Sequence, residues 1–296
     1  MRDQWLTAKS AWRQIRDMSA EQLDLFRDCT GPVRSSAAPG ASLSFEVTEL
    51  DDHKLLAVFA DPALGDCLKV LDEIGRRRLA AAVPLLRDVC RRHAGFGARR
   101  QIPEQAAALN ALLAISTREA AQTVAEAIER GWVEGPTLIV AAWCAGRLHA
   151  NLSAETVARL LQHPDPSIRI AGCGCARPYP AITALLGELM LDPRRPVAEA
   201  AACALGRLGR TEARPVLAAL LEKAPSEEVI EAASAVADER SLVLLGRIAR
   251  SGSKLAPAAL AALEDSDHPR AAKIRAAIVP ARSASASAPS GAAPQG

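Results

Sequence analysis

Four cysteines in the middle of the chain have a spacing that could support chemistry. Cys144, Cys173, Cys175 and Cys203 recur at similar offsets within consecutive predicted helices. Neighbouring helices of a stacked array could bring the four thiols together, and four thiolates can bind zinc. Cys173 and Cys175 stand two apart, so on a helix they point about 200° apart and do not easily face one metal ion. We therefore expect no metal site and interpret the four residues as small, buried side chains.

The histidines and the glycine-rich stretch do not match the motifs of known catalytic sites. No His is followed by Glu, and no His-Glu-x-x-His zinc motif occurs. Gly172-Cys-Gly174 lies within a predicted helix and lacks the third glycine of a dinucleotide-binding loop. Neither a Walker A sequence nor a Gly-x-Ser-x-Gly elbow is present. The sequence thus predicts a non-enzymatic protein that uses no cofactor.

A cluster of arginines is the main candidate for a binding site. Residues 76–100 carry eight Arg and one acidic residue, a formal charge of +7 in a chain whose total is +2. Arg can form forked hydrogen bonds to carboxylates or phosphates. A solvated, Arg-rich surface is the alternative, because runs of charge are often surface features. The candidate contact residues are Arg87, Arg91, Arg92, Arg99 and Arg100.

The surroundings of this cluster favour an acidic protein segment over nucleic acid as the partner. The stretch that follows is acidic and would repel a continuous phosphate backbone, because it contains Glu119, Glu126, Glu129 and Glu134. Trp132, between Gly131 and Val133, is a second candidate contact and is expected to be exposed. Aromatic residues dominate the binding energy of many interfaces.

The elements that position these residues are expected to be helices. Apolar residues make up 49% of the 296 residues but aromatics only 3%, and Ala and Leu are strong helix formers. No uninterrupted apolar run of eighteen residues occurs, so we expect no membrane span. The N-terminus lacks the apolar core of a secretory signal, and the seven cysteines have no paired spacing. These features predict a cytoplasmic protein with free thiols and leave its oligomeric state open.

A repeat with a period near thirty residues dominates residues 63–279. Its units begin near Leu68, Ala106, Leu138, Ile168, Val197, Val229 and Leu255, with an extended loop at 94–101. One helical hairpin cannot bury its own apolar face, so neighbouring hairpins must stack. Asp165-Pro166 and Asp192-Pro193 are expected to start helices, because Asp is a good N-cap and Pro favours the first turn. The sequence predicts an all-α solenoid of six to seven hairpins.

One unit, Val197–Leu221, resembles the HEAT-like repeat first described in phycobilisome lyases. Its matching positions are Ala201, Ala202, Ala204, Leu205, Gly206, Leu208, Gly209, Ala213, Pro215, Leu217, Leu220 and Leu221. Asp165 and Arg169 match the Asp-x-x-x-Arg entry of the same family. The resemblance implies a right-handed α-solenoid whose second helices line the concave face, the first of them near Pro84–Arg92.

The resemblance implies fold more than function, since such repeats serve adaptors, lyases, hydroxylases and DNA glycosylases. Our leading hypothesis is an adaptor or scaffold that binds a partner protein through the concave face. The alternatives are a glycosylase-like solenoid that binds nucleic acid and a lyase-type accessory or chaperone for a cofactor-bearing protein.

Two segments lie outside the repeat. In residues 1–62, an amphipathic helical pattern covers residues 1–30, and the alternation of Leu43, Phe45 and Val47 predicts a strand. Residues 54–59 either complete a β-hairpin or belong to a short helix that begins near residue 52. Residues 280–296 have too little bulky apolar surface to order themselves and are expected to form a disordered tail.

Overall fold

The computed structural model describes residues 47–60 and 67–286. Within these residues the chain forms helices and connecting turns and contains no strand. The chain divides into two compact units, Met1–Glu73 and Ile74–Gly296, and the division falls inside helix α3, Leu68–Arg77. No helix in the described ranges is both long and apolar enough to cross a membrane.

The described part of the first unit is helical. It contains a short 3-10 helix, η2 (Val47–Glu49), and helix α2 (Asp52–Ala60). The carboxylate of Asp51 accepts a hydrogen bond from the backbone N–H of Lys54 at 2.8 Å and so caps the first turn of α2.

Of the two alternatives for residues 54–59, the helix is therefore correct and the second hairpin strand is wrong. Leu55 and Phe59 stand four apart and are both buried, which is the spacing of one helical face rather than of a strand. Leu43, Phe45 and the amphipathic pattern of residues 1–30 lie outside the described residues.

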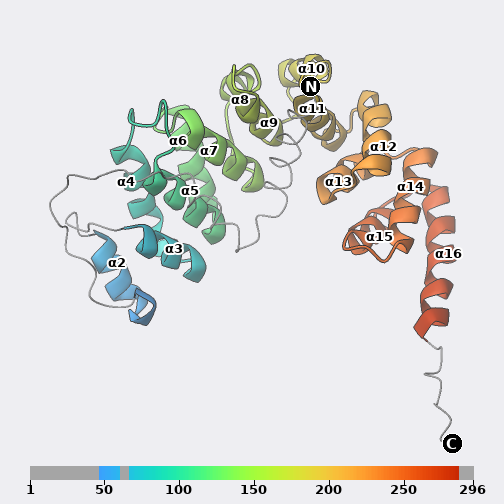
Figure 1. Cartoon of the computed structure of the whole chain (residues 1–296), viewed down its shortest axis with the longest axis horizontal. Coiled ribbons are helices and arrows are strands. Elements are labelled where there is room, and N and C mark those ends of the chain that lie inside the picture. Colours follow the sequence, from blue (N-terminus) through green and yellow to red (C-terminus); the bar gives the residue numbers. More distant parts are fainter. Residues whose placement is uncertain (1–46, 61–66, 287–296) are drawn as a thin grey trace, which may run out of the picture. The chain divides into compact units, whose positions relative to one another are not determined.

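The second unit is a series of helical hairpins (Figure 1). It begins with the end of α3, residues 74–77, and its further first helices are α5 (Pro103–Ile115), α7 (Gly135–Arg147), α9 (Pro166–Gly174), α11 (Arg195–Arg207), α13 (Glu227–Ala235) and α15 (Ala256–Glu264). The second helices are α4 (Val83–Arg92), α6 (Arg118–Glu129), α8 (Ala154–Leu161), α10 (Pro180–Leu189), α12 (Arg214–Lys223), α14 (Glu239–Arg250) and α16 (Pro269–Ala286). Short 3-10 helices, η3 (Ala80–Ala82) and η4 (Thr211–Ala213), lead into α4 and α12.

The hairpins stack through their first helices. From α5 to α15, each first helix packs against the first helix of the next hairpin. Second helices lie beside this row: α4 packs against α5 and α6, α8 against α9 and α10, and α12 against α11, α13 and α14. Buried aliphatic side chains such as Leu109, Ile168 and Leu205 fill the layer between them. The all-α solenoid of stacked hairpins predicted from the repeat is thus confirmed.

Capping side chains account for several helix starts. Asp165 caps α9 as expected, because its Oδ1 accepts a hydrogen bond from the backbone N–H of Ser167 at 2.8 Å. The parallel expectation for Asp192 is wrong, since α11 begins only at Arg195. Asp192 instead accepts from the backbone N–H of Arg194 at 2.8 Å, within the turn between α10 and α11.

The last helix extends beyond the predicted end of the array. α16 continues to Ala286, past residue 279, where the sequence predicts the repeat to end. The remaining residues of the predicted tail, 287–296, lie outside the described residues.

Candidate functional site

Helix α4 and the loop that follows it carry the five candidate arginines. Arg87, Arg91 and Arg92 lie on α4, whereas Arg99 and Arg100 lie in the irregular loop 93–102. α4 buries four apolar side chains on its other side, so its arginines remain exposed. The two loop arginines are exposed as well.

Arg87 is engaged within the molecule. Its guanidinium lies 2.7 Å from Oε1 of Glu126 on α6. The same oxygen is 2.9 Å from Nε of Arg130. Both guanidinium groups lie over the ring of Trp132, at 5.9 Å and 5.6 Å from its centroid. Arg87 therefore links α4 to α6 and to the turn that follows α6.

Trp132 is buried, with only 9% of its surface exposed, so the expectation of an exposed aromatic contact is wrong. Gly131 adopts a φ of +66°, and this left-handed turn brings the N–H of Trp132 to within 2.9 Å of the carbonyl of Ala127. The two arginines then cover the indole ring. The carbonyl of Trp132 also accepts a hydrogen bond from the buried side chain of Gln105 at 2.8 Å.

The other candidate arginines fall into two groups. Arg91 forms an ion pair with Asp88 at 3.0 Å, one helical turn away. Arg92, Arg99 and Arg100 form no ion pair with any residue in the described part of the chain. Three of the five candidate arginines are thus exposed cations available to a ligand.

Phe96 lies in the same loop and exposes 68% of its surface. The sequence reasoning missed it, although an aromatic residue between Gly95 and Gly97 in an irregular stretch is a signal that could have found it. Gly95 has a φ of +82°, and nothing lies near the position of a Cβ there. The loop therefore places a bulky apolar side chain in solvent next to the unpaired arginines.

Contacts with two neighbouring helices hold the loop in place. Gly135, at the start of α7, has a φ of +51°, and a Cβ there would lie 2.4 Å from the carbonyl oxygen of Gly97 and 2.7 Å from that of Ala98. The backbone N–H of Ile102 donates to the buried hydroxyl of Thr137 on α7 at 3.0 Å. At the other end, Gln105 of α5 donates to the carbonyl of Cys90 on α4 at 2.8 Å.

The four cysteines considered for a metal are buried core residues. The thiol of Cys144 faces the carbonyl of Leu109 at 3.6 Å, and that of Cys175 faces the carbonyl of Ala142 at 3.1 Å. Burial raises the pKa of each of the four thiols, including those of Cys173 and Cys203, to about 12. They are therefore protonated at neutral pH and pack as small apolar side chains.

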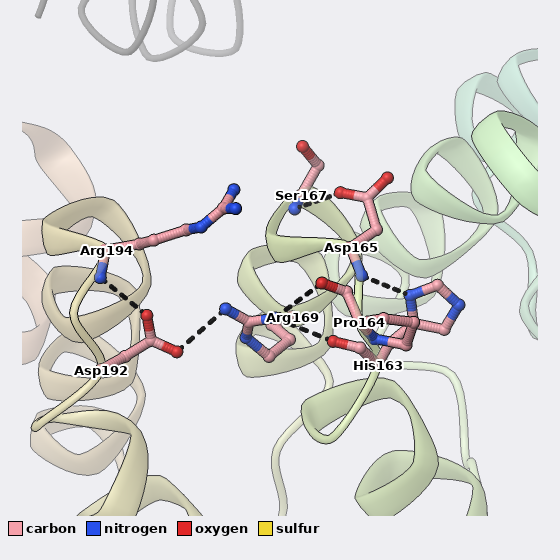
Figure 2. Close-up of polar contacts among 7 residues, drawn as sticks. All are labelled: His163, Pro164, Asp165, Ser167, Arg169, Asp192 and Arg194. Carbon is pink, nitrogen blue, oxygen red and sulfur yellow. Dashed lines mark hydrogen bonds and ion pairs between the residues drawn. The ribbon is translucent and has the colours of Figure 1, made fainter. Parts of the chain in front are cut away.

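Within the described residues, no group of three or more His, Cys, Asp and Glu side chains is arranged to hold a metal ion. His163, in the turn between α8 and α9, is partly buried. Its Nδ1 accepts a hydrogen bond from the backbone N–H of Asp165 at 3.0 Å (Figure 2).

A polar network connects helix α9 with two turns, the one before α9 and the one between α10 and α11 (Figure 2). Arg169 on α9 lies 2.9 Å from a carboxylate oxygen of Asp192, and both side chains are largely buried, at 14% and 9% exposed. Arg169 also donates to the carbonyls of His163 and Pro164 at 2.9 Å and 3.0 Å. The Asp-x-x-x-Arg motif therefore caps one helix with its Asp and fixes the next hairpin with its Arg.

A comparison with protein families supports this reading of the repeat. The family model for HEAT repeats matches residues 154–237, which run from α8 to α13 and include the network around Arg169. No curated protein matches the chain. Residues 154–237 are therefore similar to HEAT repeats, which generally mediate protein interactions as scaffolds.

Proposed function

We propose that this protein is a cytoplasmic, non-enzymatic adaptor that binds a partner protein through the concave, second-helix face of its HEAT array. The observation that carries the proposal is the set of three exposed and unpaired arginines: Arg92 at the end of the second helix α4, and Arg99 and Arg100 in the loop that follows it. Cations without internal partners complement an acidic segment, and Arg binds carboxylates with two hydrogen bonds at once.

The remaining candidates take supporting roles in this proposal. Arg87 and Arg91 keep internal ion pairs and add positive potential beside the three unpaired cations. Trp132, being buried, stabilises the position of Arg87 and does not contact the partner.

Affinity capture followed by titration of the captured partner tests the proposal. The variant R92E/R99E/R100E should lose the partner that the unmodified protein retains, with affinity falling by about tenfold or more because opposed charges become like charges. The matched control is R247E/K254E/R270E, which makes the same change in net charge at exposed positions on or near α14–α16. If the arginine-cluster variant retains the partner, these arginines are not part of the binding site.

Nucleic acid is the alternative ligand for an arginine cluster. The adjacent helix α6 and the turn after it carry four glutamates, which oppose a phosphate backbone running along the array. Titration with duplex and single-stranded DNA over a range of salt separates the two ligands. Tight binding whose logarithmic affinity falls linearly with the logarithm of salt concentration would identify nucleic acid, and not a protein, as the ligand.

A role as a lyase-type accessory for a cofactor-bearing protein is supported only by the resemblance of Val197–Leu221 to the repeats of phycobilisome lyases. The absorbance spectrum of the captured partner tests it. A visible band from a bound chromophore, carried by the partner, would favour this more specific role over a general adaptor.

A further inference from the structure

Phe96 is exposed in an unusual setting. Single exposed apolar residues are common on protein surfaces, and Leu191, which is 86% exposed, is one of them. Phe96 differs from Leu191 in its neighbours, because the same loop and the helix before it carry Arg92, Arg99 and Arg100. Aromatic and Arg side chains together contribute most of the binding energy at many protein interfaces.

The loop backbone is fixed, so Phe96 does not need to be ordered by a ligand. Two turn hydrogen bonds, from Ala94 to Arg91 at 3.2 Å and from Phe96 to His93 at 3.3 Å, fold the loop back after α4. The carbonyl of Gly97 packs against Gly135 of α7. A fixed backbone lowers the entropic cost of binding, which favours affinity.

Phe96 and the arginines share one region of the surface. The Cα atoms of Phe96 and Arg99 are separated by three residues of chain, hence by at most about 11 Å. Arg100 follows directly, and Arg92 is the last residue of α4, immediately before the loop begins. An apolar side chain flanked by cations complements a ligand with an apolar group between carboxylates.

We infer that loop 93–102 is the docking site for an extended acidic segment of the partner protein. Phe96 packs against an apolar side chain of that segment, and Arg92, Arg99 and Arg100 pair with its carboxylates. The inference rests on the proposed function and adds to it the chemistry of the bound segment and the residue that anchors it.

The charges near the loop favour a short peptide over nucleic acid. Glu134 precedes Gly135, against which the loop packs, and Glu104 opens α5 directly after the loop. A nucleic-acid strand carries a negative charge at every nucleotide and is repelled by both carboxylates, whereas a peptide can place uncharged residues beside them. Bases could still stack on an exposed aromatic ring, so single-stranded DNA belongs in the test.

Selection from a library of random twelve-residue peptides displayed on phage tests the inference, with the full-length protein as bait. We expect enriched peptides to carry Asp or Glu on both sides of a bulky apolar residue. Synthetic copies are then titrated by fluorescence anisotropy against the unmodified protein, F96A, R99E and the control L191A. Circular dichroism melting curves establish that each variant is folded.

Phe96→Ala and Arg99→Glu should each lower the affinity for the selected peptide by about tenfold or more, while Leu191→Ala should leave this affinity unchanged. Replacement of the peptide's apolar residue by Ala should weaken binding to the unmodified protein but cause little further loss with F96A, because the two side chains form one contact. Additive losses would overturn the pairing of Phe96 with that residue.

The outcomes separate this inference from the proposed function. Peptides without acidic residues, or peptides that bind F96A and R99E as they bind the unmodified protein, would overturn the docking site and leave the adaptor proposal standing. Displacement of the peptides by single-stranded DNA at low salt would overturn the acidic segment as the natural occupant. If no peptide is enriched and the captured partner also remains bound to R92E/R99E/R100E, both proposals fail.

Discussion

At the scale of single residues, Arg169 joins α9 to the turns on either side of its hairpin. Its guanidinium joins a largely buried carboxylate, Asp192, and two backbone carbonyls. Replacement by Met would leave these three acceptors without their charged donor in a poorly solvated site. We predict that R169M lowers the free energy of unfolding by about 2–4 kcal/mol, measured by urea denaturation.

An exposed ion pair between two other helices provides the control for this prediction. Arg240 and Glu222 are also joined at 3.0 Å, but their side chains are 63% and 38% exposed. R240M should therefore cost less than about 1 kcal/mol, because water screens and replaces the interaction. Equal losses for the two variants would mean that burial does not strengthen the Arg169 pair.

Single residues were predicted unevenly from the sequence, for physical reasons. Asp165 and Arg169 are set by local spacing in a repeat, so the sequence motif predicted their register. The exposure of Trp132 and of Phe96 depends on whether a turn directs the side chain toward a neighbouring helix or away from it. A turn at Gly131 buries Trp132 under two arginines, whereas the loop around Gly95 leaves Phe96 in solvent.

At the scale of elements, close approach of helix backbones explains a glycine of the repeat motif. Gly206 on α11 faces α13, and a Cβ there would lie 2.7 Å from the carbonyl oxygen of Ala232 and 2.7 Å from Cδ1 of Leu217. The backbone cannot move away without separating the two helices. We predict that G206A lowers the free energy of unfolding by about 1–3 kcal/mol in urea denaturation.

Gly187 on α10 offers a matched control for the same substitution. It also lies within a helix, but nothing is within 4 Å of its Cβ position. G187A should leave stability unchanged or raise it by up to about 1 kcal/mol, because Ala is the better helix former. Destabilisation by G187A comparable to that of G206A would contradict the packing explanation.

Elements were more predictable than side chains. Apolar spacing recurs from unit to unit, so an error at one helix is corrected by its neighbours, and α3 begins at Leu68, the position predicted for the first unit. No repeat supports the residues before it. There the alternation ending at Val47 favoured a hairpin, while the Asp51 cap and the pair Leu55 and Phe59 favoured the helix that forms.

At the scale of the whole second unit, stability should be distributed along the stack rather than concentrated in one core. Each first helix between α7 and α13 packs against a first helix on both sides, whereas α16, the last described helix, packs mainly against α14 and α15. In such arrays, stability is approximately the sum of each hairpin and its contacts with the next. Hairpins at the end of the stack should therefore open more readily than those inside it.

Hydrogen exchange followed by mass spectrometry tests this distribution. We predict that amides of α9 and α11 exchange more slowly than those of α15 and α16, since opening an inner hairpin breaks two interfaces. R169M should speed exchange in α9 and α11, because the Arg169–Asp192 pair joins α9 to the turn that leads into α11, and it should leave α15 unchanged. Uniform exchange along the stack would show that the second unit opens as one cooperative body. Faster exchange of α15 in R169M would show that coupling extends beyond nearest neighbours.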